Sequence, residues 1–277
     1  MNILVTGANG FIGTHVVRAL LGQNHAVTAL VRRPAATDDL KPSLRFATSD
    51  LTRSESIGRA FAGQSVVVHC AGRVGGPGGW PACQEAIVRA TARAVEEASR
   101  AGVQRFVHLS SLAVCAPVRR GDRLSGSSPC APSPPAWNHY ARAKIEAERI
   151  VRAARDRGRI AAVILRPGVV FGPGDPHATP AILRALSFPL SFEIGDGRNA
   201  VACLTVEDLA GAVAAAATLP GIAGRSYALA GRRICTQHDL FRIHARLAGL
   251  TVPRRSVSPG LARTLAFLFE RSGIFPE

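Results

Sequence analysis

Tyr140 and Lys144 are the residues of this chain whose types and spacing most clearly predict chemistry. The 277-residue sequence holds only two tyrosines and two lysines, and one of each stands in Tyr140-Ala-Arg-Ala-Lys144. Residues four apart share one face of a helix. An ammonium group one turn away is expected to lower the pKa of the phenol, so that it can exchange a proton near neutral pH. The pair therefore predicts an acid/base centre.

Ser110 and Ser111 end the predicted strand Arg105–Ser110, at the edge where ligands of open α/β sheets bind. A hydroxyl there can donate a hydrogen bond to a substrate carbonyl oxygen and stabilise the charge that develops on it. A serine at a strand end is more often a simple turn former. The tyrosine–lysine pair beyond the next loop favours the catalytic interpretation.

A glycine-rich turn, Thr6-Gly7-Ala8-Asn9-Gly10-Phe11-Ile12-Gly13, follows the first predicted strand and opens the first predicted helix. Gly7 permits a tight turn, Gly10 lets the backbone approach a diphosphate, and Gly13 lets the helix pack closely on the strand. The amides at the helix start can then bind the diphosphate. The pattern predicts a dinucleotide-binding turn, and a plain strand–helix turn without a ligand is the alternative.

The end of the second predicted strand bears on the choice of cofactor. Arg32 and Arg33 stand where an acidic residue would bind the ribose hydroxyls of NAD, whereas a guanidinium suits the 2′-phosphate of NADP. The sequence therefore favours NADP(H), and NAD(H) stays open because arginine is abundant throughout the chain. Asp50 follows the third strand, where it can either bind the adenine amine or act as a helix cap.

Strands and helices alternate through the first 166 residues, which predicts right-handed βαβ units. The expected fold class is α/β, a Rossmann-type doubly wound parallel sheet, with residues 167–277 as a smaller C-terminal substrate-binding lobe interleaved with the first domain. Loops at 71–83 and 116–137 follow strand ends and are expected to be functional. The predicted strands are Asn2–Thr6, His25–Val31, Leu44–Ala47, Ser65–Cys70, Arg105–Ser110, Ile160–Arg166 and Ser226–Ala230, and the predicted helices are Phe11–Leu21, Ser54–Phe61, Gln84–Ala101, Asn138–Arg157, Thr179–Leu186, Val206–Leu219, Gln237–Ala248 and Pro259–Ser272.

Composition argues against several classes of function. The net charge is +15, but its arginines are scattered rather than gathered in a stripe with aromatic residues, so nucleic-acid binding is not expected. Six cysteines without a C-x-x-C pair predict neither a disulfide framework nor a metal site, and they favour the reducing cytoplasm. No apolar run is long enough to span a membrane. The abrupt end after an apolar helix predicts a C-terminal truncation.

Together these residues resemble the extended short-chain dehydrogenase/reductase family, in its NAD(P)-dependent epimerase/dehydratase and 3β-hydroxysteroid dehydrogenase-like branch. The resemblance runs from Met1 to about Leu250 and also includes Val-His-Cys-Ala-Gly from Val68, Leu-Arg-Pro-Gly-Val-Val-Phe-Gly-Pro-Gly from Leu165 and Thr-Val-Glu-Asp-Leu-Ala from Thr205. It implies that Ser111 binds the substrate carbonyl, that Tyr140 is the acid/base, and that Lys144 binds the ribose and tunes Tyr140. The cofactor contacts that it implies are Gly7, Asn9, Gly10, Phe11, Ile12, Gly13, Arg32, Arg33, Asp50, Leu51, Cys70, Ala71, Gly72, Tyr140, Lys144, Pro167 and Val170.

Three positions depart from the family pattern. Val201 aligns with an arginine that binds the substrate diphosphate in nucleotide-sugar relatives. Ile87 replaces an asparagine of the fourth helix, which puts a proton relay through that residue in doubt. Cys115 stands where many relatives have tyrosine.

The resemblance implies an NAD(P)-dependent oxidoreductase that transfers a hydride between the cofactor and an alcohol/ketone of a small, fairly apolar metabolite. A sugar epimerase or dehydratase is the alternative, and a non-catalytic nucleotide-binding regulator is disfavoured because the tyrosine and lysine are both kept. Relatives pair the helices that correspond to Gln84–Ala101 and Asn138–Arg157 across a two-fold axis. Alanine-rich outer faces on these helices predict a homodimer of the same kind.

Overall fold

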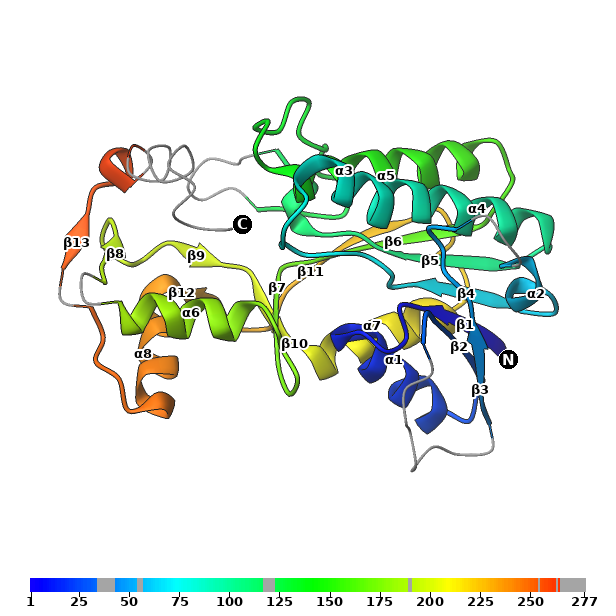
Figure 1. Ribbon diagram of the computed structural model, residues 1–277, viewed down its shortest axis with the longest axis horizontal. Helices are drawn as coiled ribbons and strands as arrows, with labels where there is room; N and C mark the ends of the chain where they lie inside the picture. Colours follow the sequence, from blue (N-terminus) through cyan, green and yellow to red (C-terminus); the bar gives the residue numbers. More distant parts are fainter. Residues whose placement is uncertain are drawn as a thin grey trace.

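The computed structural model describes residues 1–33, 43–53, 57–116, 123–188, 191–253, 255–262 and 264 of the chain. A central sheet with helices on both faces forms one end of the molecule (Figure 1). A smaller lobe that contains helices α6 (Ala178–Ser187) and α8 (Gln237–Ala248) forms the other end. No helix within the described ranges is long and apolar enough to cross a membrane.

The described part of the sheet has seven strands, parallel in every pairing, in the order β11-β6-β5-β4-β1-β2-β3. The chain enters in the middle and builds outward first on one side and then on the other. The strand order therefore reverses between β1 and β4, which is where doubly wound sheets bind ligands. This arrangement confirms the predicted fold class. The strands are β1 (Asn2–Thr6), β2 (Ala26–Val31), β3 (Leu44–Thr48), β4 (Val66–His69), β5 (Arg105–Leu109), β6 (Ala162–Pro167) and β11 (Ser226–Leu229).

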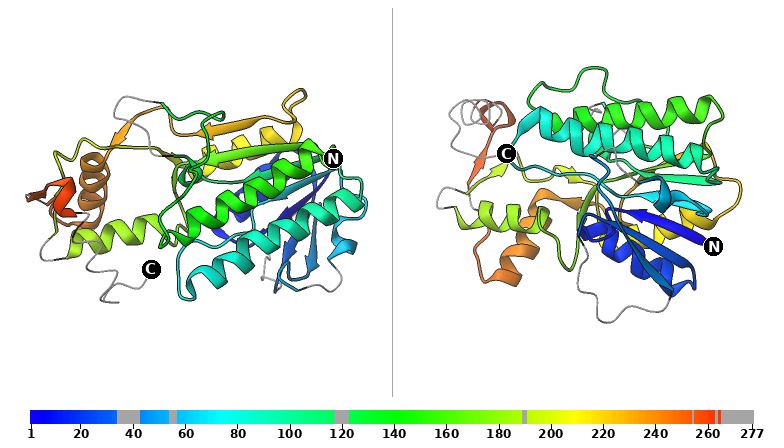
Figure 2. Two further views of the ribbon diagram at one scale, coloured as in Figure 1. Left: turned by 90° about the horizontal axis from the view of Figure 1, so that it is seen from above. Right: turned by 45° about the vertical axis from the view of Figure 1, so that its right-hand side comes forward.

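Two hydrophobic cores enclose the sheet, because alternate residues of a strand point to opposite faces. Ile3 and Val5 belong to the core formed with α1 (Phe11–Gly22) and α7 (Val206–Thr218). Leu4 belongs to the core on the other face, formed with α4 (Ala90–Arg100) and α5 (His139–Asp156). Figure 2 shows α4 and α5 side by side over that face. Burial on both faces explains why these strands are continuous apolar runs.

Two predicted helices differ from their observed forms. The predicted helix Gln84–Ala101 begins earlier, as α3 (Gly79–Cys83), and continues through a π-helical stretch, η1 (Gln84–Arg89), into α4. The last turn of the predicted helix Ser54–Phe61 is α2 (Gly58–Phe61), and residues 54–56 lie outside the described residues.

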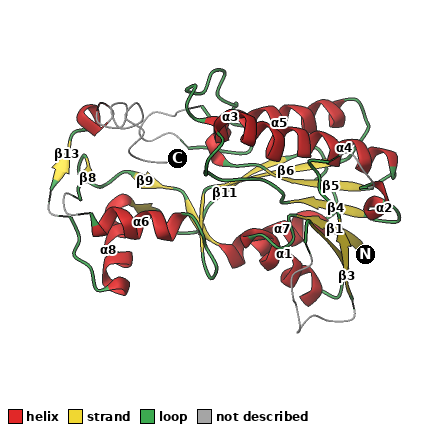
Figure 3. Cartoon of the chain, in the orientation of Figure 1, coloured by secondary structure: helices red, strands yellow, loops and turns green. Residues whose placement is uncertain are grey.

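The smaller lobe is built from short paired strands, as Figure 3 shows. Its predicted helix Gln237–Ala248 is confirmed as α8, which begins in a capping box between Thr236 and Asp239 and ends at Gly249. Before α8, the chain crosses between lobe and sheet more than once, since α7 and β11 return to the sheet. Most of the predicted helix Pro259–Ser272 lies outside the described residues. The lobe strands pair as β7 (Val169–Phe171) with β10 (Cys203–Thr205), β9 (Ala200–Val201) with β12 (Cys235–Thr236), and β8 (Glu193–Ile194) with β13 (Ser256–Val257).

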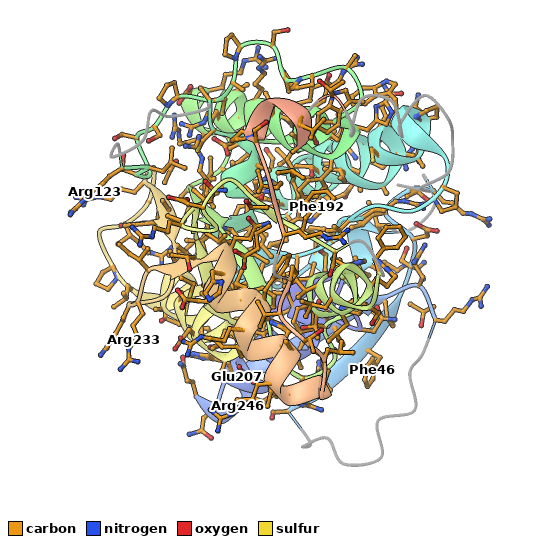
Figure 4. The ribbon with its side chains drawn as sticks, turned by 90° about the vertical axis from the view of Figure 1, so that its left-hand side faces the viewer. Phe46, Arg123, Phe192, Glu207, Arg233 and Arg246 are labelled. Carbon is orange, nitrogen blue, oxygen red and sulfur yellow. The ribbon has the colours of Figure 1, made fainter. Side chains whose placement is uncertain are left out.

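Arginine side chains are spread over the lobe end of the molecule. Figure 4 views the molecule from this end and labels Arg123, Arg233 and Arg246, which come from three separate segments. All three residues are exposed. These exposed arginines are therefore as dispersed in space as they are along the sequence.

The outer faces of α4 and α5 are not alanine-rich, which corrects the sequence expectation. Ala94 and Ala98 of α4 and Ala143 and Ala147 of α5 are fully buried. Small side chains occur there because the two helices pack against each other and the sheet. Ion pairs of exposed arginines occupy the outer surface instead, including Arg89–Glu85, Arg100–Glu96 and Arg142–Glu146.

A buried carboxylate connects α5 to the sheet. Glu148 is fully buried, and its Oε1 receives hydrogen bonds from Arg166 of β6 at 2.5 Å and from Arg152 at 2.7 Å. Its Oε2 receives one from the hydroxyl of Ser110 at 2.8 Å. Burial alone would raise the pKa of Glu148, but the hydrogen bonds from Arg166 and Arg152 outweigh it and hold this pKa below its usual 4.5.

Replacing Glu148 by glutamine should lower the free energy of unfolding by about 3–5 kcal/mol, because Arg166 would keep a buried charge without its counterion. Urea denaturation measures the loss. The matched control is Glu146→Gln on the same helix, whose exposed pair with Arg142 at 3.5 Å predicts a change within about 0.5 kcal/mol.

The stability loss in Glu148→Gln should depend on pH. Since folding lowers the pKa of Glu148, its contribution is complete above pH 4.5 and is lost as the pH falls further. The stability difference between the native chain and Glu148→Gln should therefore shrink below that pH. A difference that stays constant down to pH 3 would contradict the ion-pair interpretation.

Candidate functional site

The glycine turn between β1 and α1 has the geometry of an anion cradle. Gly7 adopts φ of +65°, and its carbonyl accepts the N–H of Gly10 at 3.0 Å. A methyl group at Gly13 would overlap that same carbonyl. Gly10 caps α1 without a side-chain hydrogen bond from the described residues, so the first amides of the helix face outward for a ligand.

A cavity of about 460 Å³ opens beside this turn, at the carboxyl edge of β1, β2 and β4. It is lined by nine of the residues predicted to contact a cofactor: Gly7, Asn9, Gly10, Arg32, Asp50, Leu51, Cys70, Ala71 and Gly72. Phe11, Ile12 and Gly13 lie in the first turn of α1, and Pro167 and Val170 lie in β6 and β7. Arg33 follows β2 and is exposed outside the cavity lining.

Other lining residues were not predicted one by one. Arg73, Val74 and Gly75 come from the glycine-rich loop that the sequence marks as functional. His177 comes from the lobe, just before α6, and no local pattern points to it. Leu30, Ser49, Thr52, Ala86 and Ala90 complete the lining.

Asp50 holds a local turn and does not cap α2, whose N-cap residue is Ile57. Its Oδ1 accepts the backbone N–H and the hydroxyl of Thr52, both at 2.8 Å. Burial would raise its pKa, but these bonds together with the nearby Arg32 lower it. The cavity wall therefore holds a carboxylate that stays ionised beside the Arg32 guanidinium.

The structure brings Ser111, Tyr140 and Lys144 together where β5 ends and α5 begins. Ser111 caps a short 3-10 helix, η2 (Leu112–Val114), by accepting the N–H of Ala113 at 3.1 Å. Its hydroxyl interacts with the Tyr140 phenol and lowers the pKa of that phenol. The Lys144 ammonium lies 6.0 Å from the centre of the Tyr140 ring and donates a hydrogen bond to Leu109 O at 2.7 Å.

The protonation of this group differs from the expectation. Burial raises the pKa of Tyr140 above its usual 10.0, and Ser111, not Lys144, is the neighbour that lowers it. Burial also lowers the pKa of Lys144 to about 8. The reason is that both groups are largely withdrawn from water, which disfavours phenolate and ammonium alike. The phenol is therefore protonated at neutral pH.

The model of the NAD dependent epimerase/dehydratase family matches residues 3–230. The chain belongs to that family. Its relatives include human sterol-4-alpha-carboxylate 3-dehydrogenase, decarboxylating, which is 28% identical over 208 residues that cover 74% of this chain and 54% of the relative. The chain therefore spans about half the length of that relative.

Two further proteins are similar over more of their length. The 2-alkyl-3-oxoalkanoate reductase of Stenotrophomonas maltophilia (strain K279a) is 27% identical over 282 residues, which cover 98% of this chain and 83% of the reductase. The solved structure of MoeE5 in complex with UDP-glucose and NAD has a TM-score of 0.75 and 28% identity, with 93% of this chain and 85% of MoeE5 covered.

The two adjacent serines have separate environments in this family member. Ser110 is 3% exposed, and its hydroxyl donates a hydrogen bond to Glu148. Ser111 is half-buried, and its hydroxyl interacts with the Tyr140 phenol. Ile87, the departure in the helix before α4, is 1% exposed and packs in an apolar cluster with Cys83 and Ala143 that Tyr140 also contacts. The surroundings of Tyr140 on that side are thus apolar.

A buried histidine pair under Lys144 was not predicted. His69 contacts Thr6 Oγ1 at 2.8 Å and Thr91 Oγ1 at 3.1 Å, and its ring stacks on that of His108 at 5.7 Å. Burial, with Lys144 nearby, lowers the pKa of His69 to about 3. Since the N–H of Ala71 donates to Thr6 Oγ1, the Thr6 hydroxyl can donate to His69 Nδ1, which leaves Nε2–H for Thr91. The pair is therefore neutral beneath the ammonium.

Gly13→Ala should weaken the binding of NADH at least tenfold, roughly 1.4 kcal/mol, because the added methyl group displaces the Gly7 carbonyl and with it the turn. Gly22→Ala is the control, since it lies in the same helix with open space around the added methyl group. Fluorescence titration gives the affinities, and thermal melting shows that both variants are folded. Wild-type affinity in a folded Gly13→Ala protein would mean that NADH does not use this turn.

Proposed function

We propose that this chain is an NAD(P)-dependent oxidoreductase acting on an alcohol/ketone pair of a small, fairly apolar metabolite. The observation that carries the proposal is the meeting of Ser111, Tyr140 and Lys144 at the strand edge that also holds the glycine cradle. The names of two relatives, a sterol carboxylate dehydrogenase and an oxoalkanoate reductase, describe oxidoreductases of apolar compounds.

The residues present fit a nicotinamide dinucleotide. Gly7 and Gly10 would hold its diphosphate at the start of α1, and Lys144 would hold the nicotinamide ribose. Arg32, in the cavity wall at the end of β2, favours the 2′-phosphate of NADP(H), and NAD(H) stays possible because MoeE5 carries NAD. When bound, this group supplies or accepts the hydride.

The side chains of this chain then manage the substrate oxygen and its proton. Ser111 donates a hydrogen bond to the carbonyl oxygen and orients it. Tyr140 is protonated at neutral pH, so it can give its proton to that oxygen during reduction. In the oxidising direction, the phenol must first lose its proton, which burial opposes.

A sugar epimerase or dehydratase is the second candidate, because the family model and MoeE5 with UDP-glucose point to it. The same three residues would serve it. Against diphosphate sugars stands Val201, an apolar residue of β9 opposite Cys235 where such relatives carry arginine. A non-catalytic regulator is disfavoured because Tyr140 and Lys144 are both present and adjacent. Two-fold homodimer assembly and a cytoplasmic location stay predictions.

Tyr140→Phe should lower kcat for reduction by about two to four decades while NADPH binding and stability persist, because it removes only the transferable proton. A panel of ketones followed by NADPH absorbance identifies the substrate first. Reduction by the native enzyme should decline as the pH rises through about 8, where Lys144 loses its charge, and further above pH 10, where the phenol begins to ionise. Near-native turnover in Tyr140→Phe would contradict the assignment.

Changing Arg32 to Asp together with Arg33 to Ser should weaken NADPH much more than NADH. A charge-assisted phosphate contact contributes about 1.5–3 kcal/mol, which is roughly one to two decades in affinity. Arg59→Asp together with Arg159→Ser, at two exposed arginines, is the control with the same change of three in net charge. Equal affinity of the native protein for the two cofactors would exclude a 2′-phosphate contact.

A further inference from the structure

Cys115 and Cys130 face each other across a short antiparallel pairing, just after the segment that carries Ser111. The N–H of Ala116 donates to Pro129 O at 3.2 Å, and the N–H of Ala131 donates to Val114 O at 2.8 Å. These bonds flank the cysteines, so the two form a non-hydrogen-bonded pair, in which Cα atoms lie about 4.5 Å apart. A disulfide requires a Cα separation of about 4.4–6.8 Å. The backbone pairing therefore meets the Cα requirement for a disulfide between them.

One buried guanidinium contacts both sulfurs. Arg166 is fully buried, its Nη1 lies 3.7 Å from Cys115 Sγ, and its Nη2 lies 3.3 Å from Cys130 Sγ. Burial raises the pKa of each thiol, and the Arg166 charge acts against that rise. Thiolate is the form of cysteine that attacks disulfides. Both thiols are also half-buried rather than sealed in the core, which gives a small reagent access.

The sulfhydryl of Cys130 has a hydrogen-bond acceptor, the Glu148 carboxylate. Its Sγ donates toward Glu148 Oε1 at 3.6 Å, and the Glu148 charge acts more strongly than the Arg166 charge on the pKa of Cys130, whereas the order is reversed at Cys115. Cys115 is therefore the better first nucleophile, and Cys130 is the residue that completes the exchange.

We propose that Cys115 and Cys130 are an oxidative modification site, where they form a reversible disulfide by exchange with a low-molecular-weight disulfide. The Cys115 thiolate attacks one sulfur of the reagent, which forms a mixed disulfide and releases one small thiolate. Cys130 then attacks the Cys115 sulfur, which closes the intramolecular bond and releases the second small thiolate. The two protein thiols lose two electrons and two protons, and the reagent gains both as two small thiols. This chemistry does not depend on the proposed oxidoreductase activity.

A second cysteine pair, Cys203 and Cys235, serves as a comparison for Cys115 and Cys130. Cys203 and Cys235 also contact each other through their sulfurs, but Cys235 is paired across the strands with Val201 rather than with Cys203. Burial and the contact with Cys235 raise the pKa of Cys203 to about 11, and no cation of the described residues is among the groups that act on it. This second pair lacks both the cross-strand placement and the guanidinium of the first.

The test treats the native full-length chain with oxidised glutathione, blocks the remaining thiols with an alkylating reagent at successive times, and analyses tryptic peptides by mass spectrometry. Arg119, Arg120 and Arg123 lie between the two cysteines in sequence, so trypsin separates them unless a disulfide links the peptides. We expect the Cys115–Cys130 linked peptide to accumulate at least tenfold faster than a Cys203–Cys235 linked peptide. Dithiothreitol should return both thiols to the alkylated form.

Two variants sharpen the result without requiring any enzymatic assay. Cys130→Ser should stop at a glutathione adduct on Cys115, whereas Cys235→Ser should leave formation of the Cys115–Cys130 bond unchanged. The proposal is overturned if both thiols of the native chain stay alkylatable throughout, or if the Cys203–Cys235 bond forms as fast. Because the native protein alone supplies these outcomes, a variant that fails to fold does not remove the test.

Discussion

The Glu148 carboxylate is the group on which the assembly of this site depends. Its position in α5 is set by residues on three other segments, because it receives hydrogen bonds from Ser110 after β5 and from Arg166 of β6, while Arg166 also binds Ser128 O. Tyr140, Lys144 and Glu148 are spaced four residues apart on one face of α5. Fixing Glu148 therefore fixes the tyrosine and lysine relative to Ser111, the neighbour of Ser110.

Burial explains the protonation of the site better than charge alone. The sequence spacing predicts an ammonium that lowers the pKa of a phenol, but the structure withdraws both groups from water. Tyr140 consequently holds its proton, and the pKa of Lys144 falls to about 8. The neutral His69 and His108 beneath Lys144 add no positive charge. A site built in this way holds a proton ready for donation.

Features encoded by short stretches could be predicted from the sequence, and features that depend on distant residues could not. The strands of the sheet, the Gly7–Gly13 turn and the start of α5 at His139, just after its cap Asn138, each follow from local pattern, and the structure contains them. The alanines of α4 and α5 were placed on the wrong face because the pattern alone does not show which stripe the partner helix covers. His177 and the Glu148–Arg166 pair come from contacts between distant segments. Arg166 stood inside a continuous apolar strand and gave no sign of its buried partner.

The departure from the family pattern at Cys115 can be interpreted only once its spatial neighbour, Cys130, is known. In sequence, it is one residue where relatives carry tyrosine, fifteen positions from another cysteine in a proline-rich loop, and the spacing predicts no link. In the structure, Cys130 is the residue directly opposite, and both sulfurs contact the guanidinium that holds Glu148. A change at the sulfurs would therefore act on the partners of Arg166, which also position Ser110. The departure and the carboxylate network are thus parts of one arrangement rather than separate features.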